Sequence, residues 1–422
     1  MRGTGLRSLS VEGKRDAREG AYGPVLWERC VTNQSMGSRA YIRVGIDGSN
    51  IRAGGGVTHL SELLANLNPG PLGIESVSVW AGPSLAGQLP LRAWLRVHRL
   101  PLLDRSRRSR AWWQARGLVA HADRGCDVLF VPGGTYLGTF RPFVTMSQNL
   151  LPFDAPERRR YGMSSTRLRL RILRTLQGRT FRRSSGVVFV SEKARRVCLT
   201  DLGELQVPTC VVPHGVAPAF FAAPRPQRSL DSYSNGDPFR FLYVSIIDFY
   251  KHQDRVVRAV GALRREKLPI ALDLIGGAYG PALAPLQRAI AEVDPRGEFV
   301  RYLGPVAHES LPALYRAADA FTFASTCETF GLILLEAMAG GLPIACSSRA
   351  AMPETLGEQG LYFDPDNEEE IVDALRLLAT SPAVRSELAV RAFKRACTFT
   401  WEAAAIATFG FIVTACAKAG GR

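Results

Sequence analysis

Short apolar, β-branched runs alternate with longer amphipathic stretches along most of this chain, and this alternation limits its possible folds more than any other feature. The pattern is typical of βα units, in which each helix returns the chain to a parallel sheet. The spacing between the runs varies, so a solenoid of fixed repeats is not expected. The expected strands are Ile42–Ile46, Val77–Trp80, Val128–Val131, Phe143–Met146, Val187–Val190, Cys210–Val212, Phe241–Ser245, Leu272–Ile275, Phe299–Leu303, Ala320–Ala324 and Ile344–Ser347.

The length of 422 residues exceeds what one ordinary core accommodates and suits two α/β domains. The most linker-like stretch runs from Ala217 to Pro238, because it combines four prolines with a Ser/Asn/Gly cluster. Residues before Tyr41 show neither the period of a strand nor that of a helix, and Met36 is an alternative start of the protein. The expected divisions are a disordered leader at 1–40, a first domain at 41–218, a linker at 219–238, a second domain at 239–400 and a terminal helix at 401–422. Two doubly wound sheets joined in this way form a cleft at the carboxyl ends of their strands.

The net charge of +15 is distributed unevenly along the chain. Residues 1–218 hold 32 basic and 15 acidic side chains, whereas residues 219–422 hold 21 and 23. A protein coated uniformly by nucleic acid would not show this asymmetry. A protein with one domain facing a polyanion or an anionic membrane would.

The basic excess is concentrated in two segments. Ten arginines and one acid lie between Glu157 and Arg183, with leucines interleaved as in a basic amphipathic helix. Five further arginines surround two tryptophans within residues 104–116. A solvated basic face explains both segments. Peripheral docking on anionic lipid, above all through Arg158–Arg183, explains them equally well, because arginines meet headgroups and tryptophans lie at the interface.

Eight cysteines lie at wide, irregular spacings, without a C-x-x-C pair. They are typical of buried thiols in a reducing compartment rather than of disulfides or zinc sites. No apolar run reaches the roughly 18 to 20 residues of a membrane-spanning helix, and the longest is Ala403–Cys416. The N-terminus lacks the apolar core of a secretory signal. We therefore expect a cytoplasmic protein whose membrane contact, if any, is peripheral.

The segment from Ser325 to Pro343 carries the strongest chemical signal. It follows an expected strand, places Glu328 and a Phe-Gly turn before a helix, and ends that helix at two glycines. Eight helical steps leave two side chains about 80° apart, so Glu328 is expected on the loop and Glu336 within the helix. Eight helical residues span roughly 12 Å, about the distance between the two sugars of a nucleotide diphosphate sugar. Free N–H groups at the helix start can hold the phosphates between them.

This pattern closely resembles that of the retaining glycosyltransferases of family four, which have the GT-B fold. The shared features are E-x7-E, F-G after the first glutamate, and E-A-M-A-x-G-x-P at the second. The resemblance covers nearly the whole chain from Tyr41 onward. Further blocks that match in order are Gly54–Gly56, Val190–Glu192, Pro213–Val216, Tyr243–Gln253, Leu303–Val306, Met352–Glu354, Tyr362–Pro365 and Trp401–Glu402.

The resemblance implies two Rossmann-like doubly wound domains that face each other across a cleft, with a C-terminal helix returning to the first domain. It also implies that Glu328 contacts the donor sugar, Glu336 the ribose hydroxyls and Lys251 the donor diphosphate. The catalytic candidates are Glu328 and Lys251, since the charge that develops on the leaving diphosphate must be stabilised. The donor-binding candidates are Glu336, Phe330, Gly331, Leu332, Gly54, Gly55, Gly56, Ser245 and His214.

Two positions depart from the family pattern. Ser245 stands where many members have an arginine, so one cationic contact is missing or comes from elsewhere. Gln148 or Asn149 stands where many members have a histidine facing the reacting sugar, and these two are the acceptor-side candidates. The mechanism usually ascribed to the family tolerates that loss, because the departing phosphate takes the acceptor's proton. His214 is left open between a turn residue and a cleft residue, and His59 is expected to be structural or solvent-facing.

A D-x-D pattern at 364–366 superficially matches the metal signature of the other large glycosyltransferase fold. Asn367 and three glutamates follow it and open a helix, so helix capping explains the pattern better than metal binding does. No other cluster in the sequence has metal-ligand spacing. We expect no metal and no cofactor, with a nucleotide diphosphate sugar as the donor substrate.

The sequence therefore favours a cytoplasmic hexosyltransferase that transfers a mannosyl or glucosyl unit, with retention, to a glycan or lipid-linked acceptor in cell-surface polysaccharide synthesis. A subunit that has the fold but little turnover is one alternative, because of Ser245 and Gln148. A basic nucleic-acid-binding protein is another, but it leaves the E-x7-E block unexplained, and no nucleic-acid partner is expected. The residues select neither the nucleobase nor the acceptor.

Overall fold

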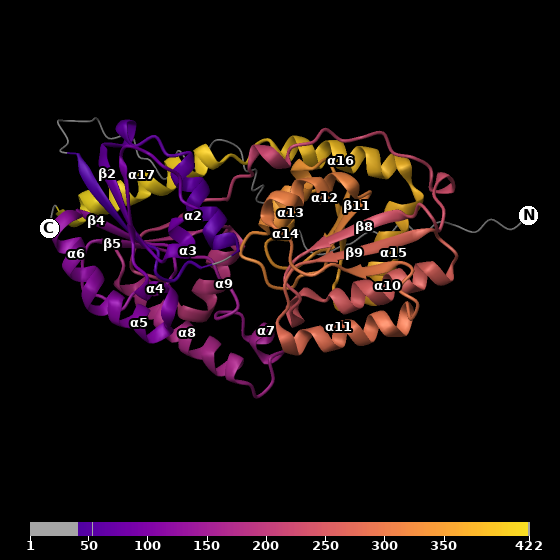
Figure 1. The fold of residues 1–422 in the computed structure, drawn as a ribbon, viewed down its shortest axis with the longest axis horizontal. Coiled ribbons are helices and arrows are strands. Elements are labelled where there is room, and N and C mark those ends of the chain that lie inside the picture. Colours follow the sequence, from indigo (N-terminus) through magenta and orange to yellow (C-terminus); the bar gives the residue numbers. More distant parts are fainter. Residues whose placement is uncertain (1–40, 53, 421–422) are drawn as a thin grey trace, which may run out of the picture.

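Two parallel sheets, one in each half of the chain, form the framework of the computed structural model, which describes residues 41–52 and 54–420. The two lobes lie side by side along the longest axis of the molecule (Figure 1). The fold class expected from the sequence, two doubly wound domains with a returning C-terminal helix, is confirmed. The expected leader lies outside the described residues.

The first sheet has seven strands in the order β3-β2-β1-β4-β5-β6-β7. Both β4 and β6 are buried along their whole length, as expected for central parallel strands of apolar, β-branched composition. The strands are β1 (Ile42–Asp47), β2 (Ile74–Ala81), β3 (Leu95–Arg99), β4 (Val128–Val131), β5 (Phe143–Ser147), β6 (Gly186–Phe189) and β7 (Thr209–Val211).

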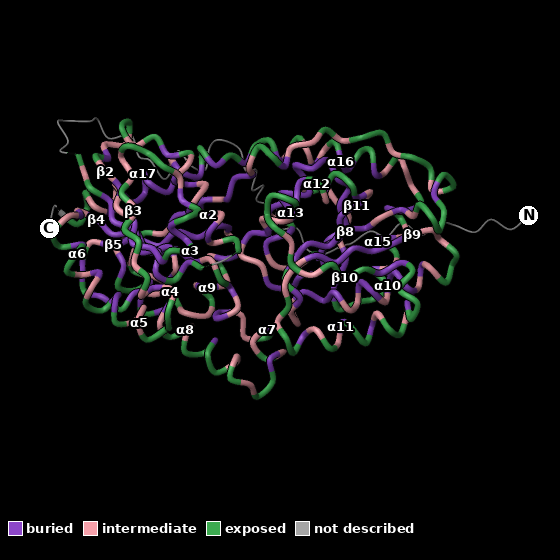
Figure 2. The backbone as a smooth tube through the Cα atoms, in the orientation of Figure 1, coloured by how far each residue is buried: buried purple, intermediate pink, exposed green. Residues whose placement is uncertain are grey.

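The second sheet has six strands in the order β10-β9-β8-β11-β12-β13. All its pairings are parallel, and the buried core runs through it as it does through the first sheet (Figure 2). The strands are β8 (Phe239–Val244), β9 (Ile270–Ile275), β10 (Val300–Tyr302), β11 (Ala320–Phe323), β12 (Ile344–Ser347) and β13 (Leu361–Phe363).

Helices make most of the connections between successive strands. In the first domain they are α2 (Gly55–Ala65), α3 (Pro83–Ala86), α4 (Leu102–Arg105), α5 (Arg107–Trp112), α6 (Leu118–Gly125), α7 (Ala155–Arg159), α8 (Ser165–Arg183) and α9 (Glu192–Leu202). A π-helical turn at Trp113–Gly117 joins α5 to α6. The segment 157–183, expected as one basic amphipathic helix, falls in two helices. A turn around Gly162, which has a φ of 54°, separates α7 from α8.

The helices of the second domain are α10 (Gln253–Arg265), α11 (Gly280–Val293), α12 (Leu311–Ala317), α13 (Leu332–Ala339), α14 (Met352–Leu356), α15 (Glu368–Thr380) and α16 (Pro382–Ala396). Short 3-10 turns lie at Phe249–Lys251 and His308–Ser310. The expected linker forms two 3-10 turns but no strand. It lies against the second domain, where the buried Arg385 donates to the carbonyl of Arg228 and to the amide oxygen of Gln227.

The last helix, α17 (Trp401–Gly420), crosses from the second domain to the first and packs on α2 and on β4, β5 and β6 (Figure 1). Contrary to the expectation from the sequence, one stretch within 382–419 is long and apolar enough to span a membrane, with a mean hydropathy of 1.5. However, 61% of that stretch is buried inside the protein. Burial inside the folded protein therefore accounts for its apolar composition.

All eleven expected strands are present, with small differences at their ends. Two strands, β3 and β13, were not expected, and both lie at a sheet edge. An edge strand is half exposed and pairs on one side only, so its sequence needs no continuous apolar run. The sequence of β3, Leu-Arg-Val-His-Arg, illustrates this, since it alternates apolar and charged or polar side chains.

Candidate active site

Both domains line one cleft of about 890 Å³. The second domain contributes the ends of β8 and β11 and the start of α13, and the first contributes α2 and the glycine loop before it. Every candidate from the sequence lines this cleft except Asn149: Glu328, Lys251, Glu336, Phe330, Gly331, Leu332, Gly54, Gly55, Gly56, Ser245, His214 and Gln148. Asn149 is exposed, and its side-chain oxygen accepts a hydrogen bond from the N–H of Leu151.

Lys251 and Glu328 form an ion pair in the floor of the cleft, although 77 residues separate them in sequence. Their side chains are 6% and 17% exposed, so both charges are largely removed from water and held by each other. Ser325 Oγ also donates to Glu328 Oε1, at 2.8 Å. The ammonium group lies 5.0 Å from the ring centroid of Phe323. The lysine and the glutamate are therefore held side by side in the floor of the cleft.

A hydrogen-bonded tyrosine fixes the two loops that carry this pair. The Tyr243 hydroxyl, at the end of β8, donates to the carbonyl of Lys251 and accepts from the N–H of Ala324, which follows β11, at 3.2 Å. Between Lys251 and the start of α10 lies His252, which has a φ of 50°. Because one buried hydroxyl binds both loops, the lysine and the glutamate are placed by the sheet rather than by mobile surface chain.

The start of α13 lines the cleft, and no side chain in the described part of the chain caps it. Gly331 has a φ of 91°, a conformation in which most side chains are strained, and it lets the chain turn directly into the helix. The first N–H groups of a helix have no partner within it, and the helix dipole makes this end electropositive. Thr355 Oγ1 anchors the preceding residue by donating to the carbonyl of Phe330 at 2.6 Å. An anionic group such as a phosphate fits here.

Glu336 lies within α13, as expected from the spacing, and is 3% exposed. Tyr315 donates to its Oε2 at 3.0 Å, and His308 Nε2 lies 3.7 Å from its Oε1. Burial raises the pKa of Glu336 even though His308 and Tyr315 oppose that shift. Hydrogen bonding to Glu336 raises the pKa of His308 in turn. The arrangement leaves a buried, oriented carboxyl at the edge of the cleft, suited to accept hydrogen bonds from hydroxyl groups.

The first domain supplies the opposite wall. The φ of 66° at Gly54 favours glycine, and no atom lies within 4 Å of where a Cβ on Gly54 or Gly55 would be, so this loop is open to a ligand. Three polar residues of α2 that sequence reasoning missed, Thr58, Ser61 and Glu62, also line the cleft. Ser61 and Glu62 follow Thr58 by three and four residues, a spacing that places the three side chains on one helix face.

His214 is a cleft residue, and it is paired with His59. The two Nδ1 atoms lie 3.0 Å apart, and Trp401 and Phe330 pack around the His214 ring. His59 is 1% exposed, so of the two expectations the solvent-facing one is wrong and the structural one holds. Burial lowers the pKa of His214 to about 4. Both rings are therefore neutral near pH 7, and His214 presents no positive charge to the cleft.

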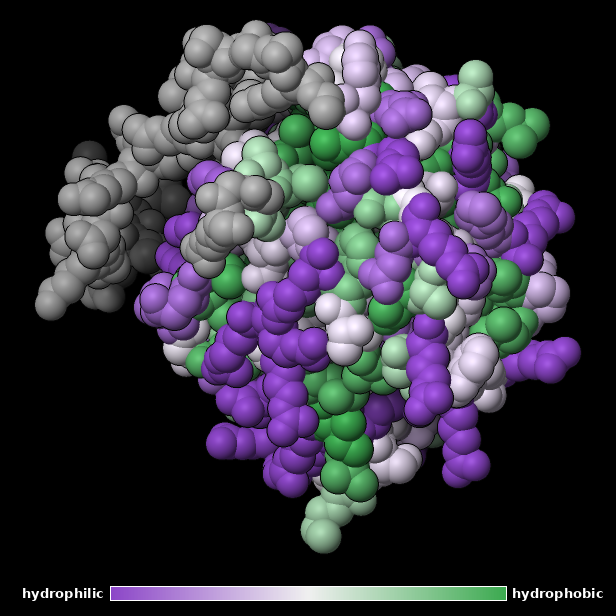
Figure 3. All heavy atoms as spheres, turned by 90° about the vertical axis from the view of Figure 1, so that its left-hand side faces the viewer, coloured by the Kyte–Doolittle hydropathy of each residue, from purple (hydrophilic) through white to green (hydrophobic). Residues whose placement is uncertain are grey.

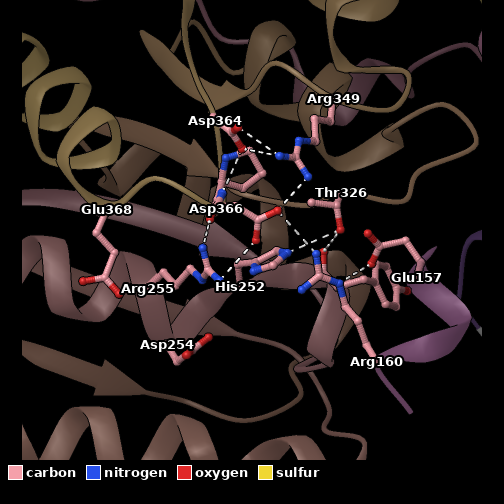
Figure 4. A network of polar contacts seen from close by, with 12 residues as sticks. Glu157, Arg160, His252, Asp254, Arg255, Thr326, Arg349, Asp364, Asp366 and Glu368 are labelled. Atoms are coloured by element: carbon pink, nitrogen blue, oxygen red, sulfur yellow. Dashed lines mark hydrogen bonds and ion pairs between the residues drawn. The ribbon is translucent and has the colours of Figure 1, made fainter. Parts of the chain in front are cut away.

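The aspartates of the D-x-D pattern form ion pairs with arginines. Asp366 contacts Arg349 Nη1 at 2.7 Å, Arg255 Nη2 at 3.1 Å and Arg160 Nη2, from the first domain, at 3.6 Å (Figure 4). Burial acts to raise the pKa of Asp366, but the three arginines lower it overall. The capping role expected for the aspartates belongs instead to Asn367, whose side chain accepts from the N–H of Glu369. Among residues 41–52 and 54–420 no cluster of three metal-ligating side chains occurs.

Further bonds join the domains behind the cleft. The carboxylate of Glu354, in α14, accepts from the N–H groups of Glu192 and Lys193 at 2.6 and 2.8 Å. It therefore caps the start of α9, a helix of the other domain. Ser191 Oγ donates to the carbonyl of Thr329, beside Glu328, at 2.5 Å. The position of the first domain is thus coupled directly to the loop that carries the catalytic candidate.

Two family models match the chain, one in each domain. The model described as "Glycosyltransferase Family 4" matches residues 53–220, and "Glycosyl transferases group 1" matches residues 228–395. The matched segments include the residues that line the cleft and every strand of the two sheets except β1.

Curated relatives match over shorter segments. The O-antigen chain mannosyltransferase B of Escherichia coli is 37% identical over 113 residues, which are 27% of this chain and 30% of that protein. The D-inositol 3-phosphate glycosyltransferase of Kineococcus radiotolerans is 33% identical over 241 residues, 52% of this chain and 54% of that protein. The match thus spans between about a third and about half of the length of these two relatives.

Solved structures resemble most of the molecule. The sucrose-phosphate synthase of Thermosynechococcus elongatus superposes with a TM-score of 0.65 at 20% identity, over 87% of this chain and 97% of that one. The Anabaena protein HepE, solved with UDP-glucose, gives 0.63 at 17% identity, over 90% and 100%. WaaG, a glycosyltransferase involved in lipopolysaccharide biosynthesis, gives 0.63 at 16% identity, over 88% and 99%. At these identities the likeness establishes the two-domain fold.

Proposed function

The chain belongs to the glycosyltransferases of family four, and on that basis we propose that it is a hexosyltransferase that uses a nucleotide diphosphate sugar. The donor lies against the second domain and the acceptor enters from the first. A mannosyl or glucosyl unit is transferred with retention to a glycan or lipid-linked acceptor, on the cytoplasmic side of the membrane, in the synthesis of a cell-surface polysaccharide. The mannosyltransferase among the relatives supports the sugar class.

The observation that carries this proposal is the placement of Lys251, Glu328 and the α13 start at one point of the cleft, with Glu336 beyond them. The diphosphate binds at the helix start, and Lys251 turns from Glu328 toward it. Glu328, released from the ion pair, accepts hydrogen bonds from the donor sugar, and Glu336 accepts them from the ribose. Each group then acts where charge or a hydroxyl lies in the bound donor.

The reaction breaks the bond between the anomeric carbon and the diphosphate oxygen and forms a bond from that carbon to an acceptor oxygen. Negative charge accumulates on the departing oxygen, where Lys251 and the N–H groups at the start of α13 stabilise it. The acceptor's proton passes to the departing phosphate on the same face of the sugar. Gln148, which lines the cleft, orients the sugar without taking the proton, since its amide is not a base.

A calorimetric screen of GDP-mannose, UDP-glucose and ADP-glucose tests donor use directly. We expect saturable binding of one of them, and at least a tenfold loss of affinity in Glu328→Ala. Glu204→Ala, an exposed glutamate of the first domain, is the matched control and should bind as the wild type does. Absence of binding for all three donors, or equal binding by Glu328→Ala, would overturn the proposal.

Retention and metal independence need a turnover assay. With the donor identified, proton NMR of the product gives the configuration at the anomeric carbon, and we expect it to match that of the donor. Activity should persist in excess EDTA, because the proposal assigns charge stabilisation to Lys251 and helix N–H groups. An inverted product, or complete loss of activity that Mg²⁺ or Mn²⁺ restores, contradicts these parts of the proposal separately from donor use.

We also propose that the basic surface of the first domain rests on an anionic membrane. On α8 the exposed Arg171 and Arg179 alternate with Leu168 and Ile172, which are 59% and 52% exposed, and Trp112 of α5 is 58% exposed. Within the described residues Arg171 and Arg179 have no acidic partner. Figure 3 shows hydrophilic side chains with apolar ones between them over the outer end of this domain. Arginines with interleaved apolar side chains suit anionic headgroups.

Vesicle flotation tests this surface. We expect recovery with phosphatidylglycerol vesicles, little with phosphatidylcholine, and release at 0.5 M salt. The double variant Arg171→Ser/Arg179→Ser should lose at least half of its recovery, whereas Arg265→Ser/Arg288→Ser, with the same change of charge on the second domain, should not. Equal flotation on neutral vesicles, or stronger binding to duplex DNA than to the vesicles, counts against the membrane assignment.

A further inference from the structure

A second hollow, of about 620 Å³, lies in the first domain beside the cleft. We call it the edge groove, and it comprises residues 86, 89–93, 95, 97 and 99. Most of its lining is apolar, including Leu89, Pro90, Leu95 and Val97, and Leu91 is 92% exposed. Leu91 thus lies in a contiguous apolar patch rather than singly, and such patches are where soluble proteins bind apolar partners.

The edge groove exists because β3 is the edge strand of the first sheet. Side chains alternate across a strand, so Leu95, Val97 and Arg99 line the groove, whereas Arg96 and His98 line a separate hollow on the opposite face. No further strand pairs with β3 among the described residues. The apolar face of this strand therefore stays partly open.

The groove adjoins the active-site cleft. Gly87 and Gln88 line the cleft, and their neighbours Ala86 and Leu89 line the groove, so one short turn forms the wall between the two. Ser61 of α2, also a cleft residue, holds this turn by donating to the carbonyl of Gln88 at 2.7 Å. A molecule that reacts in the cleft can therefore extend over the turn into the groove.

At Gly87 the wall between the cleft and the groove has no side chain. The φ of −71° and ψ of −13° at Gly87 are ordinary helical values, so the backbone does not require glycine here. A Cβ on Gly87 would meet no atom closer than 3.5 Å, and Arg99 Nη2 would be 3.9 Å away. Arg99 is exposed, and its guanidinium group has no hydrogen-bond or ion-pair partner in the described part of the chain. At Gly87, therefore, no side chain blocks the passage between the cleft and the groove, and the guanidinium group of Arg99 nearby is available to bind a ligand.

We propose that the edge groove binds the hydrocarbon chain of a lipid-phosphate acceptor, with its phosphate at Arg99 and its sugar in the cleft. This assignment rests on the proposed function and narrows the acceptor to a lipid-linked one. An apolar lining favours hydrocarbon over glycan, because a glycan needs hydrogen-bonding groups along its path. Arginine suits phosphate by charge and by its two parallel N–H donors.

Binding of farnesyl monophosphate below its micellar concentration tests the proposal, with farnesol and inorganic phosphate as separate arms. We expect farnesyl monophosphate to bind at least tenfold more tightly than either part alone, by calorimetry. Hydrogen–deuterium exchange should show protection in peptides that cover residues 83–99. Equal binding of all three probes, or protection confined to α5 and α8, would overturn the groove assignment.

Three exposed positions supply variants that leave the core intact. Gly87→Phe should block the crossing, Leu91→Ser should remove apolar contact, and Arg99→Gln should remove the phosphate partner, each weakening farnesyl monophosphate binding at least fivefold. Arg99→Lys should restore part of the affinity. The controls are Gly70→Phe, a glycine of the first domain with open space around it, and Leu377→Ser, a leucine of α15 that is 42% exposed. Unchanged binding in Gly87→Phe and Arg99→Gln contradicts the proposal.

Donor binding separates this inference from the proposed function. Leu91→Ser and Arg99→Gln should bind the nucleotide sugar as tightly as the wild type, because neither residue lines the cleft. If the donor binds and farnesyl monophosphate does not, the groove assignment alone fails. If farnesyl monophosphate binds in the groove and no nucleotide sugar binds, the proposed function fails and the lipid site stands. Protection of residues 83–99 by self-association, seen as a concentration-dependent mass, would assign the groove to a second copy instead.

Discussion

The two domains share an architecture but use its central crevice in opposite ways. In each sheet the strand order reverses between two central strands, β1 and β4 in the first and β8 and β11 in the second. Ligands of α/β proteins bind outside the carboxyl ends of such strands. In the second domain this crevice is open and holds Lys251 after β8 and Glu328 after β11.

In the first domain the same crevice is closed by a glutamine. Gln114, from the π-helical turn after α5, donates through Nε2 to Asp47 Oδ2 at 2.6 Å and to the carbonyl of Thr135 at 2.9 Å. Gln114 and Asp47 are 2% and 1% exposed. The domain meets the cleft with its glycine loop and α2 instead. A shared fold thus provides a possible site, and a few side chains decide whether it binds a ligand or becomes core.

Lys251→Ala should have the largest effect, if the open crevice is the catalytic one. Loss of the cation that stabilises the leaving diphosphate should lower kcat by about 10²- to 10³-fold. Turnover of the donor identified by calorimetry measures this. Lys394→Ala, on the exposed face of α16, is the control. A kcat within threefold of the wild type would show that the open crevice is not where the chemistry occurs.

Gln114→Leu should affect the closed crevice in a different way. The change leaves Oδ2 of the buried Asp47 without its donor, while Oδ1 keeps the N–H of Ser49, so we expect a loss of about 2 kcal/mol in the free energy of unfolding. At temperatures where the variant is folded, kcat should stay within about threefold of the wild type. Urea unfolding and the turnover assay measure the two effects, with the exposed Gln287→Leu as control. A large fall in kcat with unchanged stability would mean that the first crevice is also functional.

Lower pH should destabilise the fold at the open crevice through protonation of His252. This histidine is 3% exposed, and its Nε2 lies 3.3 Å from Thr326 Oγ1. Burial, with help from Arg160 and Arg255, lowers the pKa of His252 to about 4. The unfolded chain binds a proton at higher pH than the folded one, so stability falls as the pH drops from about 6.5 toward 4, by about 2 kcal/mol at pH 5. His252→Asn, which keeps a residue tolerant of positive φ, should lose less stability over this range. Thermal unfolding at pH 7, 6 and 5 checks the difference, and equal losses in both proteins would contradict it.

The smallest expected effect is a gain in stability from Glu336→Gln. Burial raises the pKa of Glu336, so the folded state favours the protonated carboxyl. The free energy of unfolding therefore falls as the pH rises from the pKa of this group in the unfolded chain through its pKa in the folded protein. The uncharged variant avoids this loss, so at pH 7 we expect a gain of about 1 kcal/mol, shrinking toward zero below pH 4.5. Donor affinity should fall about tenfold. Differential scanning calorimetry and donor titration measure the two, and a destabilised variant at pH 7 contradicts the argument.

Much of the fold could be predicted because buried parallel strands carry their own signal. Strands such as β4, Val-Leu-Phe-Val, are apolar on both faces and stand out from the amphipathic stretches around them. The edge strand β3 escaped prediction because charged and polar side chains interrupt its apolar residues, so it lacks the continuous apolar run of a buried strand. The same missed strand, β3, forms one side of the edge groove.

The candidate site was predictable where the residues are close in sequence. The loop position of Glu328 and the helical position of Glu336 follow from the helical repeat across one continuous segment. Asn149 was as good a candidate as Gln148, because nothing in a two-residue choice at a strand end shows which side chain turns toward the cleft. The structure orients Gln148 toward the glycine loop, with its Oε1 3.3 Å from where a Cβ on Gly56 would be.

The sequence by itself determined the βα order, the two-domain division into sheets and the motif at Glu328 and Glu336, because helical and strand periods and short motifs are local properties. Only the tertiary structure decided which charges meet. The ion pair of Lys251 with Glu328 depends on two loops that one buried tyrosine binds. The closure of one crevice by Gln114 depends on helix packing. Such pairings arise from long-range packing, which no local pattern records, so the open and the closed crevice look alike until the chain is folded.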